Sequence, residues 1–172
     1  MFLNYLKNFF TQKIVKESLA NVKHTAAQST IKTVGIIFDE TYFYEREALV
    51  RELVQNGIEE QCVKILVFKD KIKKNETFDY PVFSNKDLSW TATFDKSEVK
   101  EFIAQKFDLL LNYYDTEKPA LLLVSNQSKA AFKVGFASID KKLNHFMINT
   151  NAENYKVFVE ELFKYLKILN KI

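Results

Sequence analysis

Hydrophobic and polar positions occur in blocks along this chain, and the blocks predict strands and helices that follow one another. Continuous apolar runs occur at residues 33–38, 63–68, 108–111, 132–137 and 145–148. Short runs without a regular polar alternation are typical of strands that are buried on both faces of a sheet. The sequence therefore predicts five buried strands, and a further short edge strand is expected at residues 81–84.

Helical spacing fills the segments between these runs. Hydrophobic residues recur there every three or four positions, as on one face of a helix that packs on a sheet. The predicted helices cover residues 42–56, residues 96–106, a segment that begins near Pro119, and residues 152–169. A strand, a helix and a strand within residues 33–68 predict a βαβ unit with parallel strands and a right-handed crossover.

The last two predicted strands have a short connection. Only seven residues, 138–144, separate them, which is too few for a helical crossover, so an antiparallel pair is expected. The predicted fold class is α/β: a three-layer Rossmann-like sandwich whose mostly parallel sheet has one antiparallel edge strand. We expect residues 31–172 to form a single α/β domain and residues 1–30 to form an N-terminal amphipathic helical arm with a linker.

The arm has two apolar faces that do not coincide. On a helical wheel, one side carries the apolar residues of the first half, Phe2, Leu3, Tyr5, Leu6, Phe9 and Phe10. Nearly the opposite side carries those of the second half, Ile14, Val15, Leu19 and Val22. Since the apolar stripe changes sides near residues 12–13, either the helix kinks there or its two halves contact different surfaces.

The arm also carries the net charge of the chain. Four lysines against one glutamate give residues 2–24 a charge of +3, which equals the charge of all 172 residues. A neutral body is not expected to bind DNA, which requires a broad basic surface. The arm is predicted to dock on a protein partner or a macromolecular assembly, or at the inner membrane surface; it could equally cover the domain's own apolar surface. Candidate partner-binding residues are Phe2, Leu6, Phe9, Phe10, Lys7 and Lys13.

Several kinds of chemistry lack support in the sequence. The three glycines are isolated, so neither phosphate-binding glycine motif is present, and no cofactor is predicted. No metal site is expected because His24 and His145 lie far apart without a cluster of ligand residues. The single Cys62 allows no disulfide within the chain, and no membrane span or signal peptide is apparent. These features favour a cytoplasmic location, with peripheral contact at the inner membrane surface as an alternative.

Polar residues follow the predicted parallel strands, at the edge where ligands bind in open α/β sheets. The ligand-binding candidates at this edge are Asp39, Glu40, Tyr42, Asp70, Asn112, Tyr114 and Asp115. If the strands at 33–38 and 108–111 are neighbours, Asp39 and Asp115 would share a crevice and could bind a metal or perform acid–base chemistry. The alternative interpretation is that these side chains are ordinary helix caps and loop residues.

Three segments of the sequence carry a resemblance. F-D-L-L-L-N at residues 107–112, S-K-A-A-F-K-V-G at residues 128–135 and T-V-G-I-I-F-D-E at residues 33–40 are similar to an uncharacterised family of small Rossmann-like α/β proteins from Bacteroidota. The resemblance covers most of the chain. It implies a cytoplasmic bacterial protein of unknown function and assigns no catalytic residue.

Two functions are compatible with these observations. The first is a non-catalytic binding or adaptor protein that docks on a partner through the basic N-terminal helix. The alternative is a diverged transferase-type enzyme that binds a nucleotide-linked or small acidic substrate at the strand ends. The absence of catalytic motifs favours the non-enzymatic function.

Overall fold

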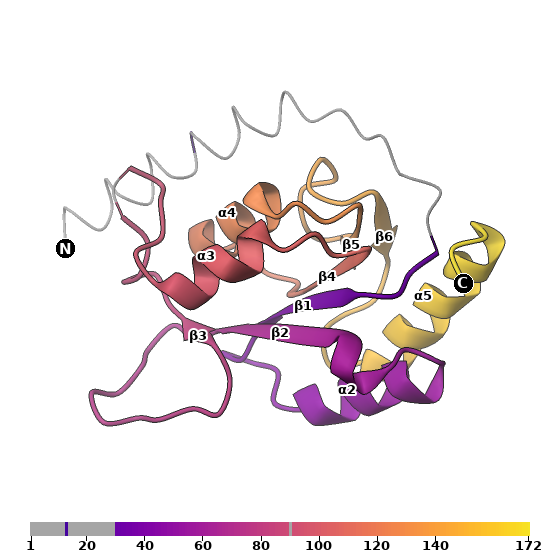
Figure 1. Cartoon of the computed structure of the whole chain (residues 1–172), viewed down its shortest axis with the longest axis horizontal. Coiled ribbons are helices and arrows are strands. Elements are labelled where there is room, and N and C mark those ends of the chain that lie inside the picture. The colour runs from indigo at the N-terminus through magenta and orange to yellow at the C-terminus, as the bar shows by residue number, and fades with distance from the viewer. Residues whose placement is uncertain (1–12, 14–29, 90) are drawn as a thin grey trace.

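A six-stranded, entirely parallel sheet forms the centre of the molecule (Figure 1). The computed structural model describes residue 13 and residues 30–89 and 91–172. The strands lie in the order β3-β2-β1-β4-β5-β6. Their bounds are Val34–Asp39 (β1), Val63–Phe68 (β2), Val82–Phe83 (β3), Leu109–Tyr113 (β4), Phe132–Phe136 (β5) and Phe146–Ile148 (β6). Five of them fall on the predicted apolar runs, and β3 falls on the short edge strand expected at residues 81–84.

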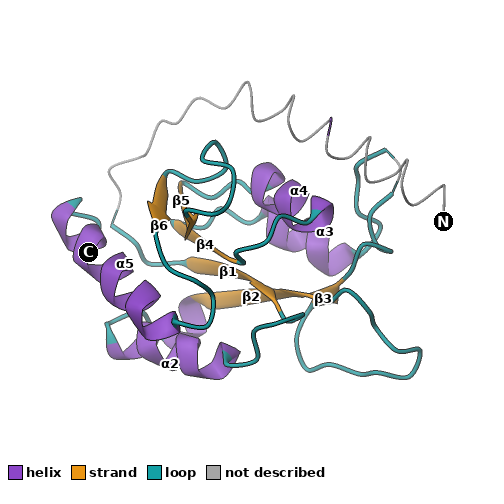
Figure 2. Cartoon of the chain, turned by 180° about the vertical axis from the view of Figure 1, so that it is seen from behind, coloured by secondary structure: helices purple, strands orange, loops and turns teal. Residues whose placement is uncertain are grey.

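Helices cover both faces of the sheet. Figure 2 shows α2 and α5 on one face and α3 and α4 on the other, so the molecule has three layers. Their bounds are Arg46–Gln55 (α2), Ser97–Ala104 (α3), Pro119–Gln127 (α4) and Tyr155–Ile168 (α5), and a single 3-10 turn, η1, covers Glu60–Cys62. The helix α4 is buried around most of its circumference, because the apolar residues 120–124 and Ser125 are all buried.

The prediction of an antiparallel edge strand is wrong. Strand β6 pairs with β5 in parallel, with Val134 opposite Phe146 and Phe136 opposite Ile148. The connection returns to the amino end of β5 without a helix, and its Ile139 and Leu143 are buried in the core. An extended segment of this length can span about 25–30 Å, which exceeds the length of a five-residue strand.

A close approach at Gly135 accommodates this return. A Cβ atom at Gly135 would lie 2.6 Å from Nδ2 of Asn144, which is closer than atoms can pack. Only glycine therefore leaves room for the Asn144 side chain against β5.

The connection from β2 to β3 also contains no helix. Residues 69–81 form turns and extended segments, which Figure 1 shows as a wide loop beyond the end of β2. A parallel crossover usually carries a helix that covers the sheet. Its absence leaves Val63 and Ile65 of β2 only partly buried, beside α2.

Most of the predicted arm, residues 1–12 and 14–29, lies outside the described residues. The exceptions are Lys13, which is helical and exposed, and Thr30, the last residue of the predicted linker. Trp90 also lies outside them. Among the arm's candidate partner-binding residues, Phe2, Leu6, Lys7, Phe9 and Phe10 are not described.

Candidate functional site at the carboxyl edge of the sheet

The strand order reverses between β1 and β4. The chain runs from β1 to β2 and β3 on one side and then crosses to β4 on the other side of β1. In open parallel sheets, ligands bind beyond the carboxyl ends of the strands at this reversal. The loop after β1 places two tyrosines there with highly exposed side chains, Tyr42 at 70% and Tyr44 at 74%.

Asp39, at the end of β1, is bound on two sides. Its Oδ2 lies 2.7 Å from Nζ of Lys118, and its Oδ1 accepts a hydrogen bond from the backbone N–H of Thr41. The same ammonium group donates to Thr41 Oγ1 at 2.7 Å and lies 3.2 Å from Oδ2 of Asp70. Lys118 therefore joins the ends of β1 and β2 to the start of α4.

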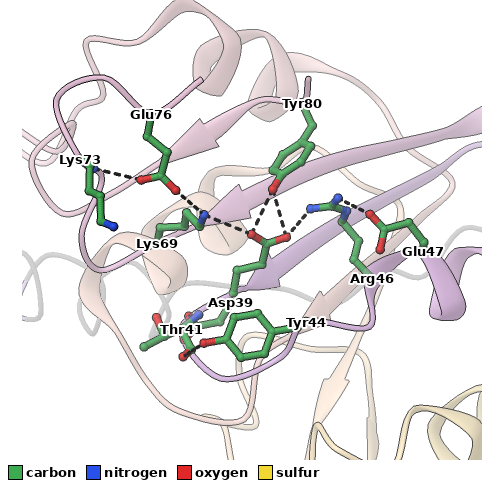
Figure 3. A network of polar contacts seen from close by, with 10 residues as sticks. Asp39, Thr41, Tyr44, Arg46, Glu47, Lys69, Lys73, Glu76 and Tyr80 are labelled. Atoms are coloured by element: carbon green, nitrogen blue, oxygen red, sulfur yellow. Dashed lines mark hydrogen bonds and ion pairs between the residues drawn. The ribbon is translucent and has the colours of Figure 1, made fainter. Parts of the chain in front are cut away.

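Glu40 is the centre of a second network, and Figure 3 labels its partners Arg46, Lys69 and Tyr80. Its carboxylate forms an ion pair with Arg46 and accepts a hydrogen bond at 3.2 Å from the hydroxyl of Tyr80. Nζ of Lys69 lies 3.7 Å from the same carboxylate and 3.0 Å from Oε1 of Glu76. One carboxylate thus holds the start of α2 and both ends of the 69–81 connection, since Lys69 begins it and Tyr80 nearly ends it.

The cations of this network keep their charge despite their partial burial. Burial acts to lower the pKa of Arg46, but the hydrogen bond with Tyr80 and the nearby Glu40 carboxylate raise it overall. The pKa of Lys69 is likewise opposed by burial and is raised overall by its hydrogen bond with Glu76. The guanidinium carbon of Arg46 also stacks 3.8 Å from the centre of the Tyr80 ring, a favourable cation–π contact.

Asn112 and Tyr114 turn away from this edge into the interior. Asn112 is fully buried; its Nδ2 donates to Asn144 Oδ1 at 2.7 Å, and its Oδ1 accepts from Ser125 Oγ at 2.7 Å. The Tyr114 hydroxyl lies 2.6 Å from the same Ser125 Oγ, and burial raises the pKa of this phenol. These two predicted site residues therefore belong to a buried neutral network.

Asp115 has other partners than Asp39. Although β1 and β4 are neighbours, the Oδ2 of Asp115 accepts a hydrogen bond at 3.0 Å from the backbone N–H of Ala152. Its backbone carbonyl accepts one from Ser138 Oγ at 2.9 Å. The contacts of Asp115 thus fasten the connections that follow β5 and β6, whereas those of Asp39 fasten α4.

Arg46, Lys118 and Tyr80 are among the residues of the two networks that sequence reasoning missed. Arg46 is the first residue of α2, and Lys118 directly precedes α4. The N-terminus of a helix carries partial positive charge and disfavours cations. A basic residue at this position is therefore a signal that an acidic partner holds it, here Glu40 and Asp39. No comparable signal marks Tyr80.

A groove of about 820 Å³ opens beside the Glu40 network. It lies between α2 and the first residues of β2, and Tyr80 also lines it. The groove is lined by Arg46, Glu47, Val50, Arg51, Val54, Gln55, Glu60, Val63, Ile65, Asp79 and Tyr80. Arg46, Glu47 and Tyr80 also belong to the network around Glu40.

Residues 30–89 and 91–172 contain no group of three or more His, Cys, Asp or Glu side chains that could hold a metal ion. Within the described part of the chain, no helix is long and apolar enough to cross a membrane.

These features define an α/β protein with a doubly wound parallel sheet, whose carboxyl edge is bound by internal ion pairs. Residues 7–169 match the model of a family of unknown function, DUF6913, and the chain belongs to this family. None of the curated proteins compared with the chain matches it.

Proposed function

We propose that this chain is a non-catalytic binding protein that docks on a protein partner or a macromolecular assembly through its basic N-terminal arm. The observation that supports it most is the engagement of the charges at the carboxyl edge. Asp39 pairs with Lys118, and Glu40 pairs with Arg46. Acid–base catalysis requires a group whose proton is exchanged with a substrate, and carboxylates fixed by internal cations are poorly suited to it.

The charge distribution supports the arm as the docking element. The arm carries the entire net charge of +3, and its first half presents four large apolar residues, Phe2, Leu6, Phe9 and Phe10. Aromatic anchors with flanking cations are frequent at protein interfaces.

Affinity purification with the tagged full-length chain tests this function. A double variant, Phe9→Ser with Phe10→Ser, should lose the partners that the wild-type chain retains, and a purified partner should bind it at least about tenfold more weakly. The matched control is Val157→Ser with Ile168→Ser, two exposed apolar residues of α5. Equal partner lists and affinities for both variants would contradict the proposal. If the Phe9→Ser, Phe10→Ser variant no longer sedimented with anionic vesicles but kept all its protein partners, the arm would be assigned to a membrane surface instead.

One observation favours the second candidate, an enzyme that binds a nucleotide-linked or small acidic substrate. The strand order reverses where Tyr42 is exposed, and Nζ of Lys118 lies 5.3 Å from the centre of the Tyr42 ring. An exposed aromatic ring next to a cation could bind a base and a phosphate. Thermal unfolding with a panel of nucleotides should then show stabilisation that Lys118→Met abolishes and Lys164→Met, an exposed lysine of α5, retains. No stabilisation by any nucleotide would exclude this candidate.

A further inference from the structure

The groove beside α2 has an apolar floor that the fold leaves without a covering element among the described residues. Val50 and Val54 come from α2, and Val63 and Ile65 come from β2. All four are at least partly exposed, with Val54 at 36%. This is the place where a crossover helix between β2 and β3 would pack, and the connection 69–81 has none.

The rim of the groove is acidic at its exposed positions. Glu47, Glu60 and Asp79 are exposed, whereas Arg51 is the single exposed cation that lines it. The other cation, Arg46, is engaged by Glu40 and Glu47. An occupant of the groove should therefore be apolar on one side and basic at its flank.

The second half of the N-terminal arm has this pattern. Its apolar stripe consists of Ile14, Val15, Leu19 and Val22, and Lys16 and Lys23 flank the stripe on one side of the helical wheel. As a helix, residues 14–22 would be about 13 Å long, and α2, whose lining residues extend from Arg46 to Gln55, is about 15 Å long. The length, the apolar face and the charge all suit the groove.

The arm also leaves the body within reach of the groove. Val34, at the start of β1, is the strand partner of Val63, at the amino end of the groove. The backbone just before it is fixed, because Asp108 Oδ2 accepts hydrogen bonds from the N–H groups of Lys32 and Thr33. Neighbouring strands are about 4.8 Å apart, and the residues 23–31 between the helix and this anchor can span about 30 Å when extended.

We propose that the groove between α2 and β2 binds residues 14–22 of the same chain as an amphipathic helix, in place of the missing crossover helix. The arm is then held by its second half, and the apolar face of its first half is presented to the partner. This inference rests on the proposed function only for the role of that presented face. Its own test uses other residues and another measurement, so either proposal can fail alone.

Disulfide trapping in the full-length chain tests the contact. In a Cys62→Ser background, Leu19→Cys is combined with Val54→Cys in the groove or with Val157→Cys on the exposed face of α5. Under mild oxidation, we expect the Val54 pair to form an intramolecular disulfide at least about tenfold faster than the Val157 pair, since a bound helix keeps the thiols together. Gel mobility without reductant and mass spectrometry of the peptides identify the bond.

Two results would overturn the proposal. Equal rates for the two pairs would mean that the arm does not prefer the groove. If the variant with Leu19→Cys and Val54→Cys formed disulfide-linked dimers in place of the intramolecular bond, the groove would be assigned to the arm of a second copy.

A second measurement avoids engineered cysteines. In the wild-type chain, docking should protect the peptide bonds after Lys16 and Lys23 from trypsin. Val54→Glu places a charge on the apolar floor and should raise cleavage there several-fold, whereas Val157→Glu should not. An unchanged cleavage rate in a Val54→Glu variant that unfolds at the wild-type temperature would also contradict the proposal.

Discussion

Two polar networks near the carboxyl ends of the adjacent strands β1 and β4 hold their side chains in different ways. Around Glu40, charged side chains at the rim of the sheet pair with one another and remain partly in contact with solvent. Around Asn112, neutral amide and hydroxyl groups of β4, α4 and the connection before β6 are buried and hydrogen-bonded to one another, although Nδ2 of Asn144 has no hydrogen-bond partner among the described residues. Burying a neutral polar group costs little once it is hydrogen-bonded, whereas burying a charge costs much more even when it is paired.

The two networks should differ in how much they contribute to stability. The Asn112 network is buried, so its mutation should lower the free energy of unfolding most. The exposed tyrosines at the carboxyl edge of the sheet contribute little to the core, so their substitution should change stability little. The following predictions test this division, beginning with the largest expected effect.

Replacing Asn112 with leucine should have the largest effect. Leucine has a similar size but removes the donor to Asn144 Oδ1 and the acceptor of the Ser125 hydroxyl, which keeps only its contact with Tyr114. We expect the free energy of unfolding to fall by about 3 kcal/mol, because each orphaned buried group costs about 1–3 kcal/mol. Urea denaturation measures it. The exposed control Asn154→Leu should change stability by less than about 0.5 kcal/mol, and equal losses would refute the division.

Removing the Glu40 carboxylate should have the next largest effect. Glu40→Ala leaves Arg46 and Lys69 without their shared anion, and we expect a loss of about 2 kcal/mol, less than for a fully buried pair because both cations remain near solvent. The double variant with Arg46→Ala should lose less than the sum of the two single variants. Glu161→Ala, which breaks an exposed pair with Lys164, should cost under about 0.5 kcal/mol. Strict additivity in the cycle would show that Glu40 and Arg46 are not coupled.

The third prediction concerns a charge placed beside the neutral network. Nζ of Lys133 donates to the backbone carbonyl of Ser125 at 2.6 Å, and burial lowers the pKa of this lysine to about 8. The unfolded chain holds this proton up to about pH 10.4, so between about pH 8 and 10 the unfolded state binds more protons than the folded state. Stability should therefore rise with pH in this window relative to Lys133→Met.

The expected difference in slope is at most about 1.4 kcal/mol per pH unit, or about 1–2 kcal/mol over the window. Chemical denaturation at about pH 8.0, 9.0 and 9.5 measures it while most tyrosines of the unfolded chain stay protonated. Parallel stability curves for the wild-type chain and Lys133→Met would show that Lys133 is not desolvated.

The smallest effect is expected at the exposed tyrosines of the loop after β1. Tyr44→Phe removes an exposed hydrogen bond from the hydroxyl to the carbonyl of Thr41 and should change stability by less than about 0.5 kcal/mol. The same substitution at Tyr114 removes a buried bond to Ser125 and should cost about 1.5 kcal/mol. Thermal unfolding of both variants would contradict the division if the two tyrosines gave equal shifts.

Much of the fold could be predicted from local patterns. Five strands fall on predicted apolar runs, β3 falls on the expected edge strand, and the four helices α2 to α5 lie within or close to their predicted segments. The candidate site was predicted less well. Asp39 and Asp70 do meet, through Lys118, whereas Asn112 points into the core and Asp115 binds the backbone before α5. The partners of a side chain at the end of a strand depend on which loops lie beside it in the folded chain.

The sequence by itself determined where strands and helices form, because their apolar periodicity is a local property of the chain. It also determined that the basic charge is concentrated in the N-terminal arm. Only the tertiary structure decided that β6 runs parallel to β5, since a connection made of turns, with Ile139 and Leu143 buried in the core, replaces a crossover helix. It also decided that Glu40 is paired with Arg46 and Tyr80, and that a groove opens beside α2. Such pairings depend on strand order and loop paths, which bring distant residues together and leave no periodic signal in the sequence.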